Sequence, residues 1–170
     1  MFDVSENEGF ELIEAGKYEA YVLKYDPISV INGVEMTNIT YKIRSDVEQK
    51  YKEREVSFDR FTYDSKMKWK ISNLAKALGF FENAETSKEV NGVRKLNFNS
   101  FEDFLQACVG KPLVIEVKHN TYTNKNNKEV TAVNVCNYEP TTFIDFTAPV
   151  DEASFLTVND EDLSTDDLPF

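Results

Sequence analysis

Alternation of apolar and polar residues predicts three strands in the first third of the chain. The run 17–29 alternates and is rich in residues that favour strands. Asn32-Gly33 is a dipeptide typical of a hairpin turn, and a second alternating run, 34–46, follows it. A third run covers residues 51–61. These segments predict that the domain begins with β-structure.

The second run alternates most regularly, with one face suited to a core and one face that is polar and basic. The residues on the first face are Thr37, Ile39, Tyr41 and Ile43. Those on the opposite face are Asn38, Thr40, Lys42 and Arg44. Because successive side chains of a strand point to opposite sides of a sheet, we expect Lys42 and Arg44 to lie together on an exposed surface.

Between residues 65 and 110 the apolar spacing changes and predicts two helices. Ser65 is a suitable N-cap for a helix over 65–79. Ser100 and Asp103 fit a capping box at the start of a second, short helix over 100–110. We expect the intervening stretch, 80–99, to be a loop.

Two further alternating runs, 112–120 and 128–138, predict the last strands, joined by a polar hairpin loop. The order is therefore three strands, a helical segment and two strands. This is the plan of an OB-fold, a mainly β, five-stranded and partly open Greek-key barrel with a helix between the third and fourth strands. Small mixed α+β domains can have the same order of elements, so the order alone does not separate the two.

The net charge of −11 is concentrated at the two ends of the chain. Residues 1–15 contain five acidic residues and no basic ones, and residues 151–170 contain seven acidic residues and no basic ones. Without these twelve acids, 18 acidic residues remain against all 19 Lys and Arg. We therefore predict an acidic N-terminal arm (1–15), an OB-fold domain (16–140) and a disordered acidic tail (141–170).

The sequence offers little support for catalysis or metal binding. The chain has one histidine, His119, and two cysteines, Cys108 and Cys136, without a CxxC pair. Because it also lacks a nucleophile motif and a glycine-rich phosphate loop, we expect no enzyme, cofactor or metal site. The N-terminus lacks the basic and apolar regions of a signal peptide, and no apolar run is long enough to span a membrane. We therefore expect a cytoplasmic protein.

The chain ends in a motif that combines acidic and apolar residues. Its residues are Asp166, Asp167, Leu168, Pro169 and Phe170. The motif resembles the C-terminal tip of bacterial single-stranded DNA-binding proteins, in which a run of Asp leads into Ile-Pro-Phe. Here Leu replaces Ile, and Thr165 interrupts the acidic run. The resemblance implies that the tip binds replication or recombination proteins, with the Phe ring in a pocket of the partner and the Asp residues steering the encounter. The alternative is a solvated acidic end.

A second, more diffuse pattern covers most of residues 9–140. It is carried by the segments AGKYEA, KIRSD, WKISNLAKALGF and VGKPLVIEVKH. Together these resemble a phage family long described as a domain of unknown function. Its members occur in phage replication and recombination modules and are thought to bind single strands. The resemblance therefore implies single-stranded DNA binding, in the host cytoplasm if the protein is encoded by a phage.

Single-strand binding requires a basic groove that follows the phosphates and aromatic rings on which bases stack. Three groups of predicted strand and hairpin residues meet this requirement. They are Lys42 with Arg44, then Arg54, Phe58 and Arg60 on one parity of the third strand, and finally Tyr122, Lys125 and Lys128 around the last hairpin. For each aromatic residue the alternative is a place in the core, and for each cation it is an ordinary solvated surface.

Trp69 is the only tryptophan, and Lys66 and Lys68 precede it. We expect it to cap the end of the barrel, with base stacking as the alternative. Tyr21 and Tyr25 on the first strand are weaker candidates for stacking, and we expect His119 to be a polar residue near a strand end.

Three functions are compatible with these patterns. The first is a single-stranded DNA-binding protein that recruits partners through its tail, and the second is an adaptor that binds only proteins. The third is a metal-dependent nuclease built on acids such as Glu55 and Asp59, although ion pairs with Arg54 or Arg60 would explain those acids more simply. Because many single-strand binders are dimers or tetramers, a second copy of the chain is also an expected partner.

Overall fold

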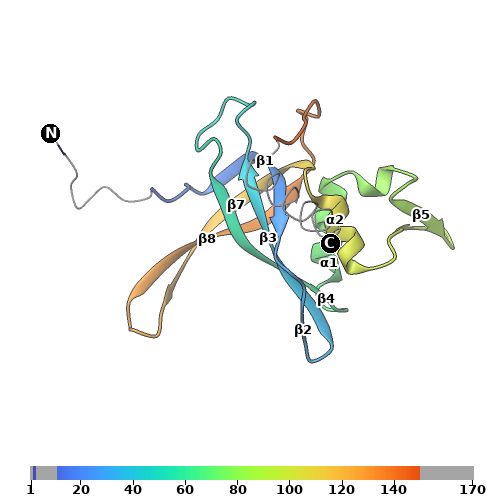
Figure 1. Cartoon of the computed structure of the whole chain (residues 1–170), viewed down its shortest axis with the longest axis horizontal. Coiled ribbons are helices and arrows are strands. Elements are labelled where there is room, and N and C mark those ends of the chain that lie inside the picture. The colour runs from blue at the N-terminus through green and yellow to red at the C-terminus, as the bar shows by residue number, and fades with distance from the viewer. Residues whose placement is uncertain (1, 3–10, 150–170) are drawn as a thin grey trace, which may run out of the picture.

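An antiparallel six-stranded sheet forms the body of the protein in the computed structural model (Figure 1). The structure describes residues 2 and 11–149. The strands are β1 (Gly16–Tyr25), β2 (Ser29–Ile31), β3 (Val34–Ile43), β4 (Glu55–Tyr63), β5 (Ser87–Val90), β6 (Val93–Leu96), β7 (Pro112–Thr123) and β8 (Glu129–Glu139). The helices are α1 (Lys68–Ala77), α2 (Phe101–Cys108) and a short 3-10 helix, η1 (Phe80–Glu82). The prediction of a mainly β protein is therefore confirmed.

The strands of the large sheet follow the order β4–β3–β1–β7–β8. The short strand β2 lies on the same edge of β3 as β1, because Met36 of β3 pairs with Ser29 on one side and with Thr62 of β4 on the other. The turn between β2 and β3 is formed by Asn32 and Gly33, both with positive φ. This confirms the hairpin that the Asn-Gly dipeptide predicts.

The two edge strands, β4 and β8, contact each other through side chains. The hydroxyl of Tyr138 on β8 donates to the carboxylate of Asp59 on β4, and the Tyr138 ring packs against Phe61. Within residues 11–149, however, no backbone ladder joins β4 to β8. The described residues therefore form a curled six-stranded sheet whose edges meet through side chains, with no closed barrel, and the short strand β2 is the strand that the predicted five-stranded, partly open barrel does not include.

The core lies on the concave side of this sheet and under the two helices. All four residues predicted for the inner face of the second strand are buried, which confirms that face, whereas Thr40 and Arg44 of the predicted polar face are buried as well. Helix α2 buries Phe101, Phe104, Leu105 and Cys108, and its N-cap is Ser100, whose Oγ accepts a hydrogen bond from the backbone N–H of Asp103. Helix α1 contacts both β4 and β8, so it covers the seam between them.

Two local predictions between residues 64 and 99 are wrong. The N-cap of α1 is Met67 rather than Ser65, because Asp64 accepts a hydrogen bond from the Met67 N–H and forms a turn before the helix. Residues 80–99 are not only a loop, since β5 and β6 pair across Asn91-Gly92 in a small separate sheet. These four-residue strands consist largely of exposed charged residues, so they lack the apolar alternation that identifies a strand.

Contacts with the body extend beyond both predicted domain boundaries. Ile13 is buried, and its carbonyl oxygen lies 2.7 Å from Nε2 of His119. Residues 141–149 also pack on the sheet, as described below. No helix among the described residues is long and apolar enough to cross a membrane.

Candidate nucleic-acid interface

The convex side of the sheet carries a cluster of basic side chains on β1, β3 and β4. The register places Lys24 opposite Thr40, and Asn38 opposite Arg60. Directly paired residues project to the same side of a sheet, and this side is opposite to the buried Ile39 and Tyr41. We call this surface the outward face and define it by its side chains, Lys24, Asn38, Lys42, Phe58 and Arg60. The exposed carboxylate of Glu55, which pairs with Lys42, lies on the same side.

Phe58 is the most exposed aromatic residue on the sheet. Its side chain is 78% exposed, and its φ of +66° lies in the left-handed region that non-glycine residues rarely adopt. The reason is a β-bulge: Asp59 pairs with Ile39 and Val56 with Tyr41, so Ser57 and Phe58 together face the single residue Thr40. The bulge turns the ring away from the core and places it among the cations of the outward face.

Asp59 points to the opposite side of β4 and is buried in the core. Its Oδ2 accepts hydrogen bonds from the hydroxyls of Tyr41 at 2.7 Å and Tyr138 at 2.5 Å, and its Oδ1 lies 2.8 Å from Nζ of Lys70. The carboxylate thereby links β3, β8 and α1 at the seam between the sheet edges. Because these three partners hold the carboxylate of Asp59, they also fix the backbone of β4 directly after Phe58.

The two tyrosines of this network remain neutral donors. Burial raises the pKa of Tyr41 well above its usual range, and the nearby Asp59 carboxylate raises it further. Burial is also the largest cause of the raised pKa of Tyr138, followed by the charge of Asp59. Both hydroxyls therefore keep the protons that they donate to Asp59.

A hollow of about 260 Å³ extends the outward face beyond Arg60 towards the β2–β3 hairpin. Arg60, Asn38 and Met36 border it on the sheet side, and Asp26, Ser29 and Ile31 on the other. Arg60 is exposed, so its guanidinium stands at the edge of a groove rather than inside the core.

Arg44 does not lie on the outward face, so the prediction that it shares an exposed surface with Lys42 is wrong. Its side chain is 1% exposed. It forms two hydrogen bonds with Asp46, at 2.9 and 2.7 Å, and a third, at 2.8 Å, with the carbonyl oxygen of Phe143. Its Cζ also lies 4.4 Å from the centroid of the Phe146 ring. These hydrogen bonds hold the pKa of Asp46 below its usual range. Arg44 is buried because residues 141–149, which we call the strap, cover its side chain.

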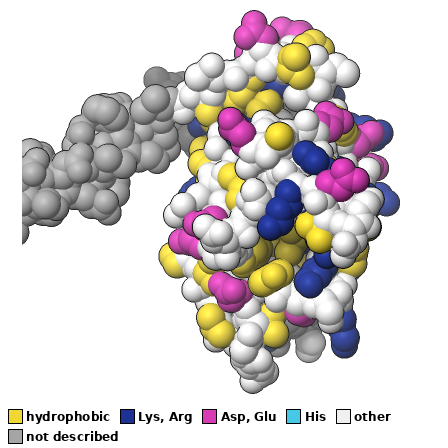
Figure 2. Space-filling model, turned by 90° about the vertical axis from the view of Figure 1, so that its right-hand side faces the viewer, with side chains coloured by type: hydrophobic (Ala, Val, Ile, Leu, Met, Phe, Trp, Pro, Cys, Tyr) yellow, Lys and Arg dark blue, Asp and Glu magenta, His cyan; other side chains and the backbone are white. Residues whose placement is uncertain are grey.

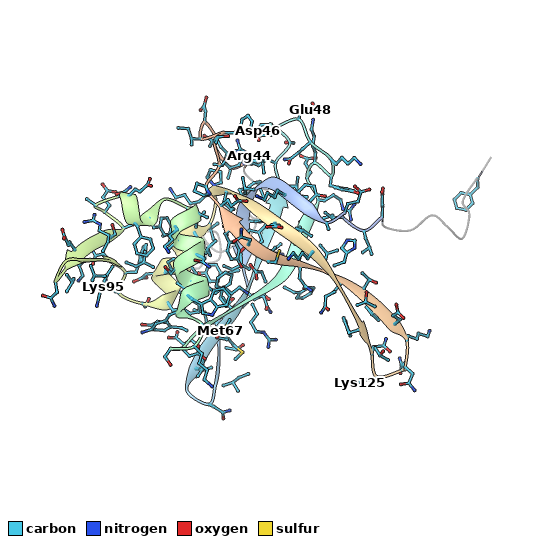
Figure 3. All side chains as sticks on the ribbon, turned by 180° about the vertical axis from the view of Figure 1, so that it is seen from behind. Arg44, Asp46, Glu48, Met67, Lys95 and Lys125 are labelled. Carbon is cyan, nitrogen blue, oxygen red and sulfur yellow. The ribbon has the colours of Figure 1, made fainter. Side chains whose placement is uncertain are left out.

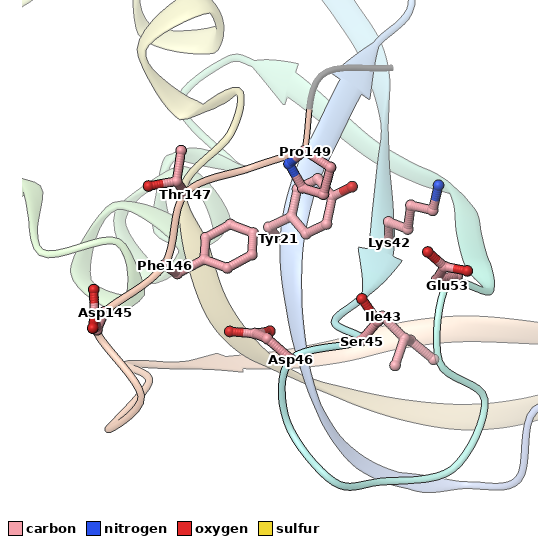
Figure 4. Close-up of a pocket in the computed structure, with 10 residues that line it drawn as sticks. All are labelled: Tyr21, Lys42, Ile43, Ser45, Asp46, Glu53, Asp145, Phe146, Thr147 and Pro149. Carbon is pink, nitrogen blue, oxygen red and sulfur yellow. The ribbon is translucent and has the colours of Figure 1, made fainter. Parts of the chain in front are cut away.

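The strap closes one side of a pocket of about 300 Å³ at the end of the outward face (Figure 4). The ring of Phe146 packs on Tyr21, with 5.1 Å between the ring centroids, so that Tyr21 is buried. Thr141 fastens the start of the strap through a hydrogen bond to Glu19. Asp145 lines the pocket on the side of the strap, and Lys42 and Glu53 line it on the opposite side.

Arg54 serves a different surface from Phe58 and Arg60. It precedes β4, and its Nη2 donates a hydrogen bond of 2.8 Å to the carbonyl oxygen of Glu11. Its guanidinium lies 5.7 Å from the centroid of the Tyr51 ring. The prediction that Arg54 lies on the same side of the strand as Phe58 and Arg60 is wrong. The β-bulge at Ser57 and Phe58 shifts the register, so the simple alternation from Arg54 to Arg60 does not hold.

Tyr122, Lys125 and Lys128 lie on the ribbon formed by the ends of β7 and β8, which projects from the body (Figure 1). Tyr122 is 50% exposed, and Lys125 and Lys128 belong to the exposed loop at the tip. Seen from behind, Lys125 stands far from Arg44 and Asp46 (Figure 3). These three residues therefore form a separate arm rather than part of the outward face.

Lys24 is a member of the outward face that the sequence pattern does not identify. A register shift between Val22 and Lys24 places Lys24 opposite Thr40 and on the same side as Tyr21. Simple alternation from Tyr21 would place Lys24 on the other side of the strand. The only feature of the sequence that could have indicated Lys24 as a binding residue is its position between Tyr21 and Tyr25 on one strand.

An apolar hollow of about 320 Å³ lies on the helical side of the molecule. Its walls include the stacked rings of Tyr63 and Phe101, together with Leu96, Phe98 and Phe104. Figure 2 shows apolar side chains in a hollow on this side, with both basic and acidic side chains around it. A phosphate backbone fits this mixed rim less well than the outward face.

The acids that a nuclease would need are not brought together in the described part of the chain. Glu55 is exposed, whereas Asp59 is buried and paired with Lys70 instead of with Arg54 or Arg60. Among residues 11–149, no group of three His, Cys, Asp or Glu side chains could hold a metal ion. The tip formed by Asp166, Asp167, Leu168, Pro169 and Phe170 lies outside the described residues.

Comparison with known proteins identifies one family. The family described as "Protein of unknown function (DUF669)" matches residues 1–152. No curated protein matches the chain.

Proposed function

The chain belongs to the DUF669 family, and we propose that it is a phage-type single-stranded DNA-binding protein. In this proposal it coats single strands without strong sequence preference during replication or recombination. The observation that carries the proposal is the exposed ring of Phe58, held in a left-handed conformation between Lys24, Lys42 and Arg60.

The chemistry of this surface favours a single strand of any sequence. Each base that stacks on an aromatic ring contributes about 1–3 kcal/mol, and every base has a face that can stack. Lys24, Lys42 and Arg60 would bind phosphates, which carry no sequence information. The bases of a duplex are already stacked on one another, so Phe58 would favour single strands.

The topology supports the finer prediction of an OB-fold. If β1, β3, β4, β7 and β8 are the five strands of the barrel, the order β4–β3–β1–β7–β8 is that of an OB-fold, with β2 as an extension of the first hairpin. OB-folds bind oligonucleotides on the face of their second and third strands and with the loops after the first and fourth strands. Those features correspond here to the outward face, the β2–β3 hairpin and the β7–β8 ribbon. In this proposal Tyr122, Lys125 and Lys128 belong to an arm that closes over the bound strand.

The acidic tail supports a second part of the proposal, the recruitment of replication or recombination proteins. Asp166 and Asp167 would steer the tip to a basic patch on the partner, and Phe170 would enter a pocket beside it. The strap supports this role because it fixes the start of the tail beside the outward face. A tail that begins there can present its tip while the body holds DNA.

Fluorescence anisotropy of labelled oligo-dT with the full-length protein tests the proposal. We expect binding that weakens steeply with salt, because each neutralised phosphate adds about 0.7 to the slope for single strands. Lys42→Ala and Arg60→Ala should each reduce that slope by about this amount. Lys95→Ala, on the separate β5–β6 sheet, is the matched control and should leave it unchanged.

The other outcomes distinguish the remaining functions. Absence of binding at low salt, together with capture of a replication protein through Phe170, would support the adaptor that binds only proteins. Cleavage of the oligonucleotide on addition of a divalent metal would support the nuclease.

A further inference from the structure

We propose that Trp69 forms a second base-stacking site, so that a bound single strand continues from the outward face over the edge of β4 to the start of α1. This inference rests on the proposed function and extends its binding site to a surface outside the sheet. The ligand is a nucleobase of a single strand, with its phosphates beside Lys66 and Lys68.

Trp69 does not cap the barrel, contrary to the prediction from its place at the start of a helix. Its side chain is 59% exposed, although α1 buries Ile71, Leu74, Ala75 and Ala77. The core under α1 is thus complete without the indole ring. Tryptophan offers a large face for stacking, and an exposed one adjacent to lysines is typical of single-strand sites.

The indole borders a cleft of about 190 Å³ between α1 and β8. Asn73 lies one helical turn from Trp69 on the same side of α1, and Asn137 lines the cleft from β8. Within residues 11–149 neither of these amides has a hydrogen-bond partner, so both can bind the edge of a base.

The surroundings of Trp69 are basic. Lys66 and Lys68 are both exposed, and Lys68 lies above the ring of Tyr63, with 5.8 Å between Nζ and the ring centroid. Lys70, in contrast, is held by the carboxylate of Asp59 and by the carbonyl oxygen of Arg60. Lys66 and Lys68 are therefore the cations that can bind phosphates, while Lys70 serves the fold.

The same contacts of Lys70 connect this cleft to the outward face. Lys70 follows Trp69 in α1, and its partners, Asp59 and Arg60, directly follow Phe58 in β4. The start of α1 therefore lies against the part of β4 that displays Phe58 and Arg60. Because no backbone ladder joins β4 to β8 in the described part of the chain, a strand that leaves Arg60 can reach the cleft across the edge of β4.

The experiment uses Trp69 itself as the reporter, because it is the only tryptophan. Full-length protein is titrated with dT oligomers of about 4 and about 16 nucleotides, which span the usual range of sites for one OB-fold. Anisotropy of the labelled oligomer and tryptophan emission are recorded on the same samples. We expect the longer oligomer to quench Trp69 in parallel with binding, and the shorter one to quench it less.

Substitutions separate stacking from an indirect effect. Trp69→Ala should weaken binding of the longer oligomer about 5-fold or more, which corresponds to the lower limit for one stacked base, and Trp69→Phe should retain part of the affinity. Val93→Ala, another exposed apolar residue, is the matched control and should leave affinity unchanged. Unfolding temperatures should be similar for all variants, because Trp69 contributes little to the core.

Two further outcomes overturn the inference in different ways. If the longer oligomer binds but Trp69 emission and the affinity of Trp69→Ala are unchanged, the second site is wrong and the proposed function stands. If no oligomer binds at any salt concentration, the proposed function fails and this site fails with it.

Discussion

Phe58 and Asp59 are consecutive residues that point to opposite sides of β4, one with an exposed ring and the other with a buried carboxylate. Asp59 is held by Tyr41, Tyr138 and Lys70, and the bulge that this requires leaves Phe58 in a left-handed conformation. Such conformations cost about 1–3 kcal/mol and persist where the surrounding structure enforces them, often at functional sites. The network of Asp59 therefore positions the ring of Phe58 before any ligand arrives.

Phe58→Gly should separate stability from binding. Glycine adopts positive φ without a steric penalty and the Phe58 ring is exposed, so the free energy of unfolding in urea should fall by no more than about 1 kcal/mol, or should rise. Loss of the stacking ring should lower affinity for oligo-dT by about 1–3 kcal/mol in anisotropy titrations. Phe58→Tyr retains a ring and should bind like the original protein. Unchanged affinity in Phe58→Gly would remove Phe58 from the binding site.

Asp59→Ala should strongly destabilise the fold. It leaves two buried hydroxyls without their acceptor and the Lys70 ammonium without its ion-pair partner, and removal of one partner of a buried ion pair typically costs about 3–5 kcal/mol. Urea unfolding measures the loss, and Asp59→Asn, which keeps an acceptor, should lose less. Glu55→Ala removes an exposed acid of the same strand and should change the free energy of unfolding only slightly. A small loss in Asp59→Ala would mean that the network does not hold the seam.

Alkaline pH should unfold the protein through Tyr41 and Tyr138. Their pKa values are raised in the folded state, so their contribution to stability is fully present below the unfolded pKa of about 10 and is lost as pH rises above it. In a spectrophotometric titration, at least two of the eight tyrosines should ionise only together with loss of the folded circular dichroism signal. Ionisation of all eight while the fold persists would contradict this.

Arg44→Lys should release the strap. Lysine cannot form the paired hydrogen bonds with Asp46 and also reach the carbonyl oxygen of Phe143. Hydrogen–deuterium exchange of a peptide that covers residues 141–149 should become faster, and the unfolding temperature should fall. Lys95→Ala, on the separate β5–β6 sheet, is the control and should leave exchange in the strap unchanged. Equal exchange in Arg44→Lys would show that other contacts hold the strap.

The sequence predicts the inner face of β3 and the N-cap at Ser100 because both depend on residues close in the chain. The position of Phe58 depends instead on its neighbour Asp59 and on the hydrogen bond to Asp59 from Tyr138, 79 residues after Asp59, so parity along β4 could not reveal it. The burial of Arg44 likewise depends on Phe143, 99 residues later. Alternation along β3 cannot distinguish an exposed basic residue from a buried one. Arg44 is buried by the strap, which belongs to the segment that the sequence predicts to be a disordered tail.

Photocrosslinking of a 5-iododeoxyuridine oligonucleotide to the full-length protein, followed by mapping of the modified peptide, tests most directly whether Phe58 contacts DNA. The account predicts that the main adduct lies on the peptide that contains Phe58, and that Phe58→Gly abolishes it. Binding with adducts only elsewhere on the molecule, or no binding at low salt, would contradict the outward face as the site.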